Sequence, residues 1–195
     1  GIIQLSLKPV DGTPAPDFQP GAHIDLHLPN GLVRQYSLLG SAPEGMLEVA
    51  VNLDPNSRGG SAAVHQDLKP GDELEIGLPR NHFPLIENAP HSVLIAGGIG
   101  ITPIHAMVHR LAGLGRGWTL YHCARSPERT PYMAELRALA AGSGGMLVHV
   151  HDGVAGVRPL DLAAVVAGFP AGTHFYCCGP GPLMAGFATA TSDLP

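Results

Sequence analysis

A glycine-rich segment at residues 96–103, AGGIGITP, directly follows the most apolar run of the chain. Glycines after a buried strand let a diphosphate approach the backbone, and the first turn of a following helix offers free N–H groups and a positive dipole end. We expect Thr102 to cap that helix or bond the ligand, and Pro103 to suit its first turn. The strand before and the helix after favour a dinucleotide phosphate site over a plain tight turn. Its predicted cofactor-binding residues are Gly97, Gly98, Gly100, Thr102 and Pro103. The glycine spacing differs from G-x-G-x-x-G, which points away from an ordinary dehydrogenase.

A second candidate is the pentapeptide RQYSL, residues 34–38, on a predicted strand. Alternation places Arg34, Tyr36 and Leu38 on one face and Ser37 on the other, unless the strand kinks. An arginine offers a fork of donors to a phosphate, and a tyrosine offers a flat ring that can cover another flat ring. Taken without context, such a strand is more often a solvated face than a binding site.

A third candidate is the turn NSRGGSA, residues 56–62, which leads into a short predicted helix. Glycines before a helix make a possible anion site. Capping of the helix by Ser57 or Ser61 explains the same residues without a ligand.

A fourth candidate is YCCGP, residues 176–180, at the carboxyl end of the last predicted strand. Ligands of open parallel sheets bind at that edge, so Cys178 is expected to face a crevice, with Gly179 and Pro180 starting the next helix. Packing of the cysteine as a small buried side chain is the simpler alternative.

The segment RSPER, residues 125–129, follows the second strand of the predicted parallel sheet, where such folds discriminate at the adenosine 2′ position. Arg125 is included among the cofactor-binding residues. An acidic residue here favours NADH, whereas Ser126 and Arg129 could hold a 2′-phosphate.

Two histidine pairs suggest a rival metal chemistry. His105 and His109 lie one helical turn apart, and His149 and His151 flank Val150. Both spacings suit zinc. Neither pair carries the glutamate of H-E-x-x-H, and His109 is expected to face solvent, so no metal ligand is predicted.

The first half of the chain must supply strands to position these residues. Apolar and polar residues alternate at 24–28, and the pattern continues at 33–39, 47–53 and 73–78, with turns at Pro-Gly and Asn-Gly pairs between them. This spacing predicts an antiparallel closed or Greek-key barrel, interrupted by one helix at 60–68.

The pattern of hydrophobic residues changes near residue 89. Apolar strands are predicted at 92–96, 118–123, 146–150 and 173–178, separated by helices at 104–114, 132–141 and 160–166. Strands alternating with helices indicate a parallel α/β sheet. We therefore predict two domains, 1–89 and 90–195.

Composition excludes several classes of protein. Of 195 residues, 45% are hydrophobic, so the chain can bury a core, and a net charge of −5 argues against duplex nucleic acid as the partner. Three cysteines, two of them adjacent, do not make a disulfide scaffold and favour a reducing compartment. No leader peptide or membrane-spanning run is visible, so a cytoplasmic protein is expected.

Taken together, the motifs resemble the flavin- and nicotinamide-binding part of the ferredoxin–NADP reductase superfamily, in the group of phthalate dioxygenase and vanillate demethylase reductases. The segments carrying the resemblance occur in the expected order over nearly the whole chain: RQYSL, NSRGGSA, LPRNHFPL, IAGGIGITPI and FYCCGPGPLM. The resemblance implies that Arg34 and Tyr36 hold the flavin phosphate and cover its ring, and that Ser37 lies near flavin N5. It assigns Gly59, Gly60 and Ser61 to the phosphate site, and the glycine corner at 97–102, with Cys178 and Gly179, to the nicotinamide cofactor. Leu38, Val51 and Pro180 complete the predicted cofactor-binding set.

Two departures from that family stand out. Members of the group end in a ferredoxin domain whose four cysteines hold a 2Fe–2S cluster, whereas this chain has three cysteines and no C-x₄-C-x₂-C run. They also carry an additional strand at each end of this region. A fragment of a longer protein is expected, with a free-standing reductase as the alternative.

The resemblance implies a function. The first domain is expected to bind FMN and the second NADH, with nicotinamide C4 over flavin N5 in the crevice between domains, and Ser37 and Cys178 next to the reacting atoms. Electrons would pass singly to a 2Fe–2S ferredoxin domain or protein and on to a Rieske-type oxygenase. A stand-alone FAD- and NADPH-dependent reductase and a non-enzymatic nucleotide-binding module are the alternatives.

Overall fold

The computed structural model describes residues 1–40 and 42–194, so Ser41 and Pro195, the last residue of the predicted second domain, lie outside it. The chain divides into two compact units, Gly1–Leu85 and Ile86–Pro195. This division falls four residues before the predicted boundary. Ile86 and Glu87 are fastened to the second unit, because the Ile86 amide donates to the Tyr176 hydroxyl at 2.9 Å and Glu87 pairs with Arg110 at 2.7 Å.

The first unit consists of two small antiparallel sheets. In one, β1 (Ile2–Leu7) pairs with β4 (Leu47–Asn52). In the other, β2 (Ala22–His27) lies between β3 (Val33–Ser37) and β5 (Arg80–Asn81). A bridge between Leu38 and Val49 joins the two sheets, and the helix α1 (Gly60–Gln66) follows β4. The antiparallel strands predicted at 24–28, 33–39 and 47–53 and the helix predicted at 60–68 are confirmed.

One predicted strand, at 73–78, is wrong. In this segment only Ile76 forms a β-bridge, antiparallel with Leu26, supported by backbone hydrogen bonds from His27 to Glu75 and from Gly77 to Asp25, while the strand β5 comes later, at Arg80–Asn81. The alternation at 73–78 has a physical basis, since Leu74 and Ile76 pack against the core. At Gly77 a Cβ would lie only 3.2 Å from the Cβ of Asp25, so the segment approaches β2 closely, and its pairing with β2 is limited to one bridge.

The alternating pattern of β2 explains the core of the first unit. Ala22, Ile24 and Leu26 are buried and their neighbours are not, as expected of a strand with one face in a core. These residues pack with apolar side chains of β4 and α1, including Leu47, Val49, Val51 and Val64.

The second unit is a parallel sheet of four strands in the order β8-β7-β6-β9. The strands are β6 (Ser92–Gly97), β7 (Trp118–Ala124), β8 (Met146–His151) and β9 (His174–Cys178). Every residue of β6 is buried, as a central parallel strand covered on both faces requires. This confirms the sheet predicted from the apolar runs.

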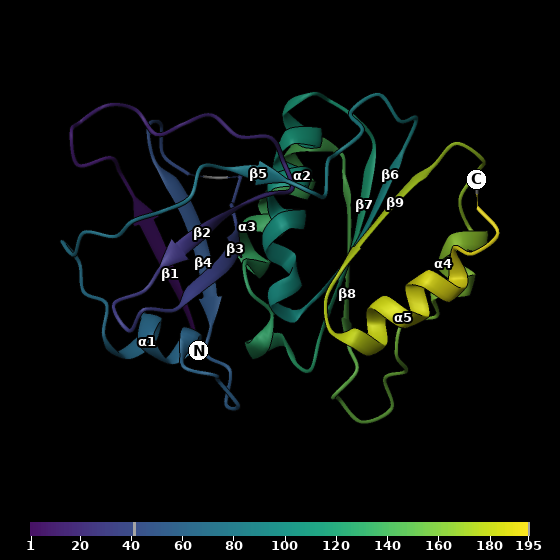
Figure 1. Cartoon of the computed structure of the whole chain (residues 1–195). Helices are drawn as coiled ribbons and strands as arrows, with labels where there is room; N and C mark the ends of the chain where they lie inside the picture. The colour runs from purple at the N-terminus through teal and green to yellow at the C-terminus, as the bar shows by residue number, and fades with distance from the viewer. Residues whose placement is uncertain (41, 195) are drawn as a thin grey trace. The chain divides into compact units, whose positions relative to one another are not determined.

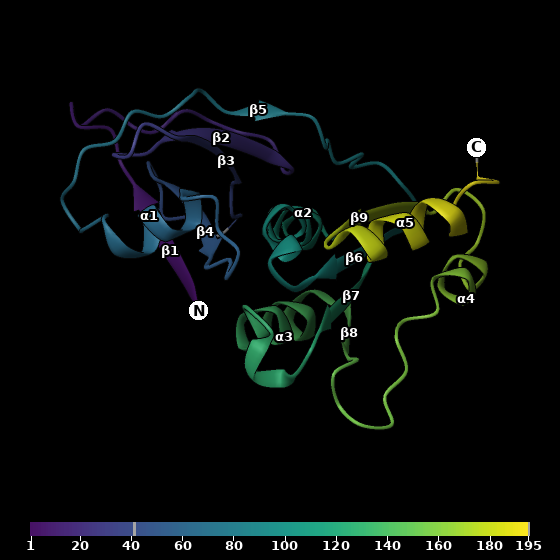
Figure 2. The same ribbon diagram turned by 60° about the horizontal axis from the view of Figure 1, so that its bottom comes forward.

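Helices cover both faces of this sheet. The helices α2 (Ile101–Gly113) and α3 (Met133–Ser143) lie on one face, and α4 (Leu162–Ala167) and α5 (Gly181–Ala190) lie on the other (Figures 1 and 2). Short 3₁₀ turns stand at Gly98–Gly100 and Pro127–Arg129. Because the strand order turns back between β6 and β9, the loops after these two strands diverge to opposite faces, which is where open α/β sheets bind ligands.

Among the described residues, no helix has the length and apolar character needed to cross a membrane.

Candidate functional site

The glycine corner after β6 packs directly against the corner after β9. A Cβ on Gly100 would collide with the Cys178 carbonyl oxygen, and a Cβ on Gly97 would lie 2.7 Å from Cδ of Pro180. A Cβ on Gly179 would in turn lie 3.0 Å from the Gly97 backbone. These three glycines are therefore required by the close approach of two chain segments at the strand-order reversal. The sequence had suggested that they make room for a ligand.

Gly98 differs from the other glycines of this corner. Its φ of +53° is a left-handed conformation that favours glycine, and a Cβ there would meet nothing within 4 Å. The helix α2 begins three residues later with no side-chain cap on its first turn. Gly98 is thus the position of the corner where an anion could approach free backbone N–H groups.

Thr102 and Pro103 both lie in the first turn of α2. The Thr102 hydroxyl donates to the carbonyl of Ile99 at 3.1 Å, so in this structure it neither caps the helix through an N–H group nor faces outward. Pro103 is buried. Both side chains stabilise the turn itself, and the Ile101 amide also donates within it, to the carbonyls of Gly98 and Ile99.

The two adjacent cysteines of β9 face opposite sides of the sheet. Cys177 is buried against Val93, Ile95 and Val165, and burial raises the pKa of its thiol to about 12. Cys178 is half-buried, and its backbone carbonyl lies against Gly100. Burial also raises the pKa of the Cys178 thiol. Both groups therefore stay protonated near neutral pH, and neither is poised as a thiolate nucleophile.

The Pro180 carbonyl begins α5, accepting from the amide of Met184 at 3.1 Å. This agrees with the predicted helix start after Gly179.

In the first unit, Arg34 lies over the glycine turn that precedes α1. A Cβ on Gly60 would be 2.7 Å from Nε of Arg34, so the arginine side chain fits only because residue 60 has none. The guanidinium donates to the Arg58 carbonyl at 3.3 Å and to the Val33 carbonyl at 2.9 Å. Two arginines 24 positions apart in the sequence, Arg34 and Arg58, are thus joined at this turn.

The serines of this turn bond to its backbone. The Ser57 hydroxyl accepts from the Ala62 amide at 3.3 Å, and the Ser61 hydroxyl accepts from the Asp54 amide at 3.1 Å. Gly59 has φ of +88° and its carbonyl accepts from Asn30 at 3.1 Å. The N-cap residue of α1 is Gly59, which has no side chain, while the Ser57 hydroxyl accepts from a first-turn amide of α1 and Ser61 bonds within the turn.

Strand β3 presents its residues as the alternation predicted. Arg34 and Tyr36 are half-buried while Val33 and Gln35 are exposed. Tyr36 pairs with Ile24 across the ladder and packs on the apolar core, and burial raises the pKa of its hydroxyl. Ser37 pairs with His23 on the other face and is also half-buried.

Two predicted cofactor-binding residues lie in the core of the first unit. Leu38 is 0% exposed and Val51 is 2% exposed. The Leu38 amide is also engaged, donating to the Ala22 carbonyl at 2.9 Å. In this structure both side chains pack the strands together.

The segment after β7 carries both signs of charge. Arg125 is mostly exposed, 3.8 Å from Asp152. The pKa of Glu128 is lowered, chiefly by a hydrogen bond from the Ser126 side chain. The Ser126 hydroxyl, which could have held a 2′-phosphate, thus donates to the Glu128 carboxylate.

The histidine pair of α2 meets a third residue. Nε2 of His105 and Nε2 of His109 both lie 3.0 Å from the same carboxylate oxygen of Glu135, in the first turn of α3. The His109 side chain is only 22% exposed, so the expectation that it faces solvent is not met. Glu135 was missed because it lies 26 and 30 residues from its partners, beyond the range of any local motif.

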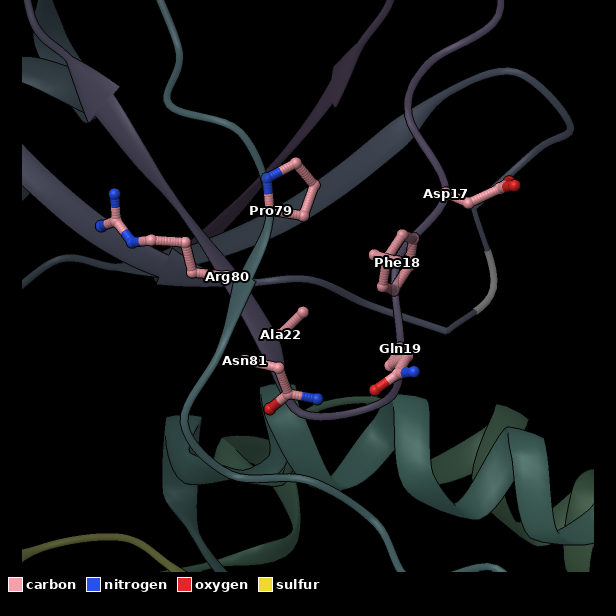
Figure 3. Close-up of a pocket in the computed structure, with 7 residues that line it drawn as sticks. All are labelled: Asp17, Phe18, Gln19, Ala22, Pro79, Arg80 and Asn81. Atoms are coloured by element: carbon pink, nitrogen blue, oxygen red, sulfur yellow. The ribbon is translucent and has the colours of Figure 1, made fainter.

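A hollow of about 390 Å³ lies elsewhere on the first unit, beside β5. It is lined by Asp17, Phe18, Gln19, Ala22, Pro79, Arg80 and Asn81. Figure 3 shows the rings of Phe18 and Pro79 on neighbouring segments, with the Arg80 and Asp17 side chains directed outward on opposite sides. Arg80 donates to Asp25 at 2.7 Å. None of the predicted cofactor-binding residues lines this hollow.

Comparisons with known proteins agree with this geometry. Residues 94–189 match the oxidoreductase NAD-binding domain. The chain is 46% identical to tetrachlorobenzoquinone reductase of Sphingobium chlorophenolicum over all of its length and 60% of that protein. It is 42% identical to vanillate O-demethylase oxidoreductase of Pseudomonas sp. strain HR199, over 94% of the chain and 57% of the relative. Its structure resembles phthalate dioxygenase reductase with a TM-score of 0.88 and 37% identity, over all of this chain and 60% of that one. The chain thus spans about three fifths of the length of these relatives.

Proposed function

The chain is a member of the ferredoxin–NADP reductase superfamily, in the group of phthalate dioxygenase and vanillate demethylase reductases, and we propose from this membership that it transfers hydride from NADH to FMN. The proposal rests on one observation: the chain contains two separate glycine turns of the kind that bind nucleotide phosphates. One is the Arg34–Gly60 turn of the first unit, and the other is the Gly98 corner of the second.

The residues of both turns fit the groups they are proposed to hold. A flavin phosphate is an acceptor of charge-assisted bonds, and Arg34 lies against a turn that has no side chain at residue 60. Tyr36 offers its half-buried ring on the same face of β3 as Arg34. In the second unit, a diphosphate can reach the backbone at Gly98, where no Cβ stands in the way.

The protein groups bind, orient and exclude water, while the redox chemistry is supplied by the cofactors. When bound, the nicotinamide provides a hydride and the flavin provides a ring that accepts it and releases electrons singly. Ser37 is proposed, from family membership, to donate a hydrogen bond at flavin N5; it is half-buried and directly follows Tyr36 on β3. The Cys178 thiol, kept protonated by burial, is proposed to position the nicotinamide by packing.

NADH is the proposed nucleotide in preference to NADPH. The 2′-phosphate of NADPH would bring further negative charge towards Glu128 and Asp152, both beside the segment that follows β7. Like charges at short range oppose binding. Arg125 is proposed to contact the adenosine end from its exposed position.

The electron acceptor is proposed to be a 2Fe–2S ferredoxin domain or protein, which serves a Rieske-type oxygenase. Support comes from the names of the relatives, which include reductases of demethylase and dioxygenase systems. The structure of similar fold is described as transferring electrons from pyridine nucleotides to a 2Fe–2S centre. Because the chain spans about 60% of these proteins, the acceptor is proposed to lie outside the sequence described here.

The proposed function is tested by flavin content and reduction. The purified protein is expected to be yellow or to turn yellow with FMN, and denaturation should release FMN. Anaerobic mixing with NADH should bleach the flavin absorbance, because hydride passes to the flavin. Release of FAD, together with faster bleaching by NADPH, would instead identify a stand-alone reductase. Nucleotide binding without bleaching would identify a binding module.

Replacement of Ser37 tests its proposed role at N5. Ser37→Ala is expected to slow reduction of the flavin by NADH while leaving flavin content near that of the unaltered protein, because the hydroxyl is removed and the strand is retained. Stopped-flow absorbance at saturating NADH measures the rate. Ser143→Ala is the matched control, since that hydroxyl bonds the Leu139 carbonyl within α3 of the second unit. An unchanged reduction rate in Ser37→Ala would reject the role.

A further inference from the structure

The cluster of His105, His109 and Glu135 lies on the α2–α3 side of the second unit and has no part in the proposed hydride transfer. Its three ligand-type atoms all lie within 4.8 Å of one another. His105 is fully buried, His109 is 22% exposed and Glu135 is 38% exposed, so the cluster opens to solvent on one side only. A buried group with a single open direction can hold an ion and leave room for a water ligand.

The placement of the three residues follows from helix geometry. His105 and His109 are four residues apart on α2, which puts their rings on one face, with centroids 4.4 Å apart. Glu135 projects from the first turn of α3 onto that face. The ring of Tyr132, at the start of α3, lies 4.9 Å from the His105 ring and covers it.

The distances are close to those of a ligated metal. Bonds of about 2.0–2.1 Å from zinc to nitrogen or oxygen, set at the tetrahedral angle, separate two ligand atoms by about 3.3 Å. Each Nε2 atom here is 3.0 Å from the same glutamate oxygen, and the three ligand atoms lie within 4.8 Å of one another, so an ion requires the side chains to adjust, with the glutamate oxygen moving away from the rings. The donor set of two imidazoles and one carboxylate is one that zinc takes with an open fourth position.

We propose that His105, His109 and Glu135 form a binding site for a divalent transition metal of the Zn²⁺ class, which links α2 to α3. The bound ion takes one nitrogen from each histidine, one glutamate oxygen and a water on the open side. Hard cations such as Mg²⁺ prefer all-oxygen sites and are excluded by the imidazoles. Because the three ligands come together only when both helices are in place, metal binding stabilises the folded second unit.

Direct binding is the first test. The full chain is stripped of metal with a chelator, which is then removed, and is titrated with ZnCl₂ in a calorimeter. One ion per chain is expected to bind, with no binding of MgCl₂. CoCl₂ is expected to give visible absorption bands of a low-symmetry nitrogen and oxygen site, and excess zinc should remove them. At zinc about 100 times its Kd, the melting temperature should rise by about 5–10 °C.

Two exposed-side variants separate a metal site from a plain hydrogen-bonded cluster. Glu135→Gln keeps an oxygen that can accept from both rings but loses the charge, and His109→Gln removes one ligand. Each variant is expected to weaken zinc binding by at least about 100-fold. Losing a residue that only hydrogen-bonds to a metal ligand weakens binding by up to about 100-fold, and losing the ligand itself should weaken it at least as much. His27→Gln, on β2 of the first unit, is the matched control and should bind as the unaltered chain does.

The outcomes are decisive in both directions. Loss of the one-to-one isotherm and of the cobalt bands in Glu135→Gln and His109→Gln, with both retained in His27→Gln, supports the site. Unchanged zinc affinity in both variants, or no saturable binding by the unaltered folded chain, overturns it. The melting temperature of each metal-free variant is measured beside that of the unaltered chain, so that a loss of zinc binding is distinguished from a loss of folding. Because zinc binding is read without NADH or flavin, the result is independent of the proposed function.

Discussion

Arg34→Ala is expected to lose most of its bound flavin. A hydrogen bond to a charged group contributes about 1.5–3 kcal/mol, which corresponds to a 10- to 150-fold rise in Kd. The Arg34 guanidinium lies on the Gly60 turn at the position proposed for the flavin phosphate, so its removal takes away the charge while the strand remains. Fluorescence titration of flavin-free protein with FMN measures the Kd.

Controls for Arg34→Ala separate binding from folding. Arg158→Ala removes an exposed arginine from the second unit and should leave the Kd unchanged. The truncated analogue riboflavin, which has no phosphate, should bind Arg34→Ala and the unaltered chain equally. Retention of FMN at native affinity by Arg34→Ala would contradict the phosphate site.

Gly100→Ala is expected to destabilise the second unit. The added Cβ would occupy the space of the Cys178 carbonyl oxygen, and backbone on both sides leaves no flexible side chain to move. Overpacking of this kind costs about 1–3 kcal/mol or more. For a chain of this size the melting temperature should fall by about 2–4 °C for each kcal/mol. Calorimetric melting measures the change.

Two other glycines serve as controls. Gly113→Ala, at the end of α2, meets nothing within 4 Å and should be neutral or stabilise by up to about 1 kcal/mol. Gly98→Ala places a methyl group in the open space of the corner at a positive φ. Its strain of about 1–3 kcal/mol overlaps the cost expected for Gly100→Ala, and it should also weaken NADH binding. Equal melting of Gly100→Ala and Gly113→Ala would show that the packing argument is wrong.

Local chemistry in the sequence was enough to predict most elements of the fold, although it did not predict β1 or β5 and made a strand of residues 73–78. The alternation at Ile24 and Leu26 placed a half-buried strand, and the unbroken apolar run at Ser92–Gly97 placed a buried parallel one. The hydrophobic period and the flanking turns depend only on neighbouring residues, so they can be recognised without knowing how the rest of the chain folds. The order of the motifs then indicated the family.

Tertiary structure decided what each motif residue does. Leu38 and Val51 continue strands that look like binding strands, yet their side chains close the core. Gly97 and Gly100 look like room for a ligand, yet they admit the backbone of Cys178 and Gly179. Whether the space beside a glycine is filled by protein depends on how distant segments pack, which no local pattern records.

The sequence by itself determined which segments become strands, helices and glycine turns, because hydrophobic period and backbone freedom act over a few residues. Only the packing of helix on helix brought Glu135 to His105 and His109, and only the crossing of two corners filled the space beside Gly100. Such contacts join residues far apart along the chain. They depend on the relative placement of whole elements, which is settled when the core closes.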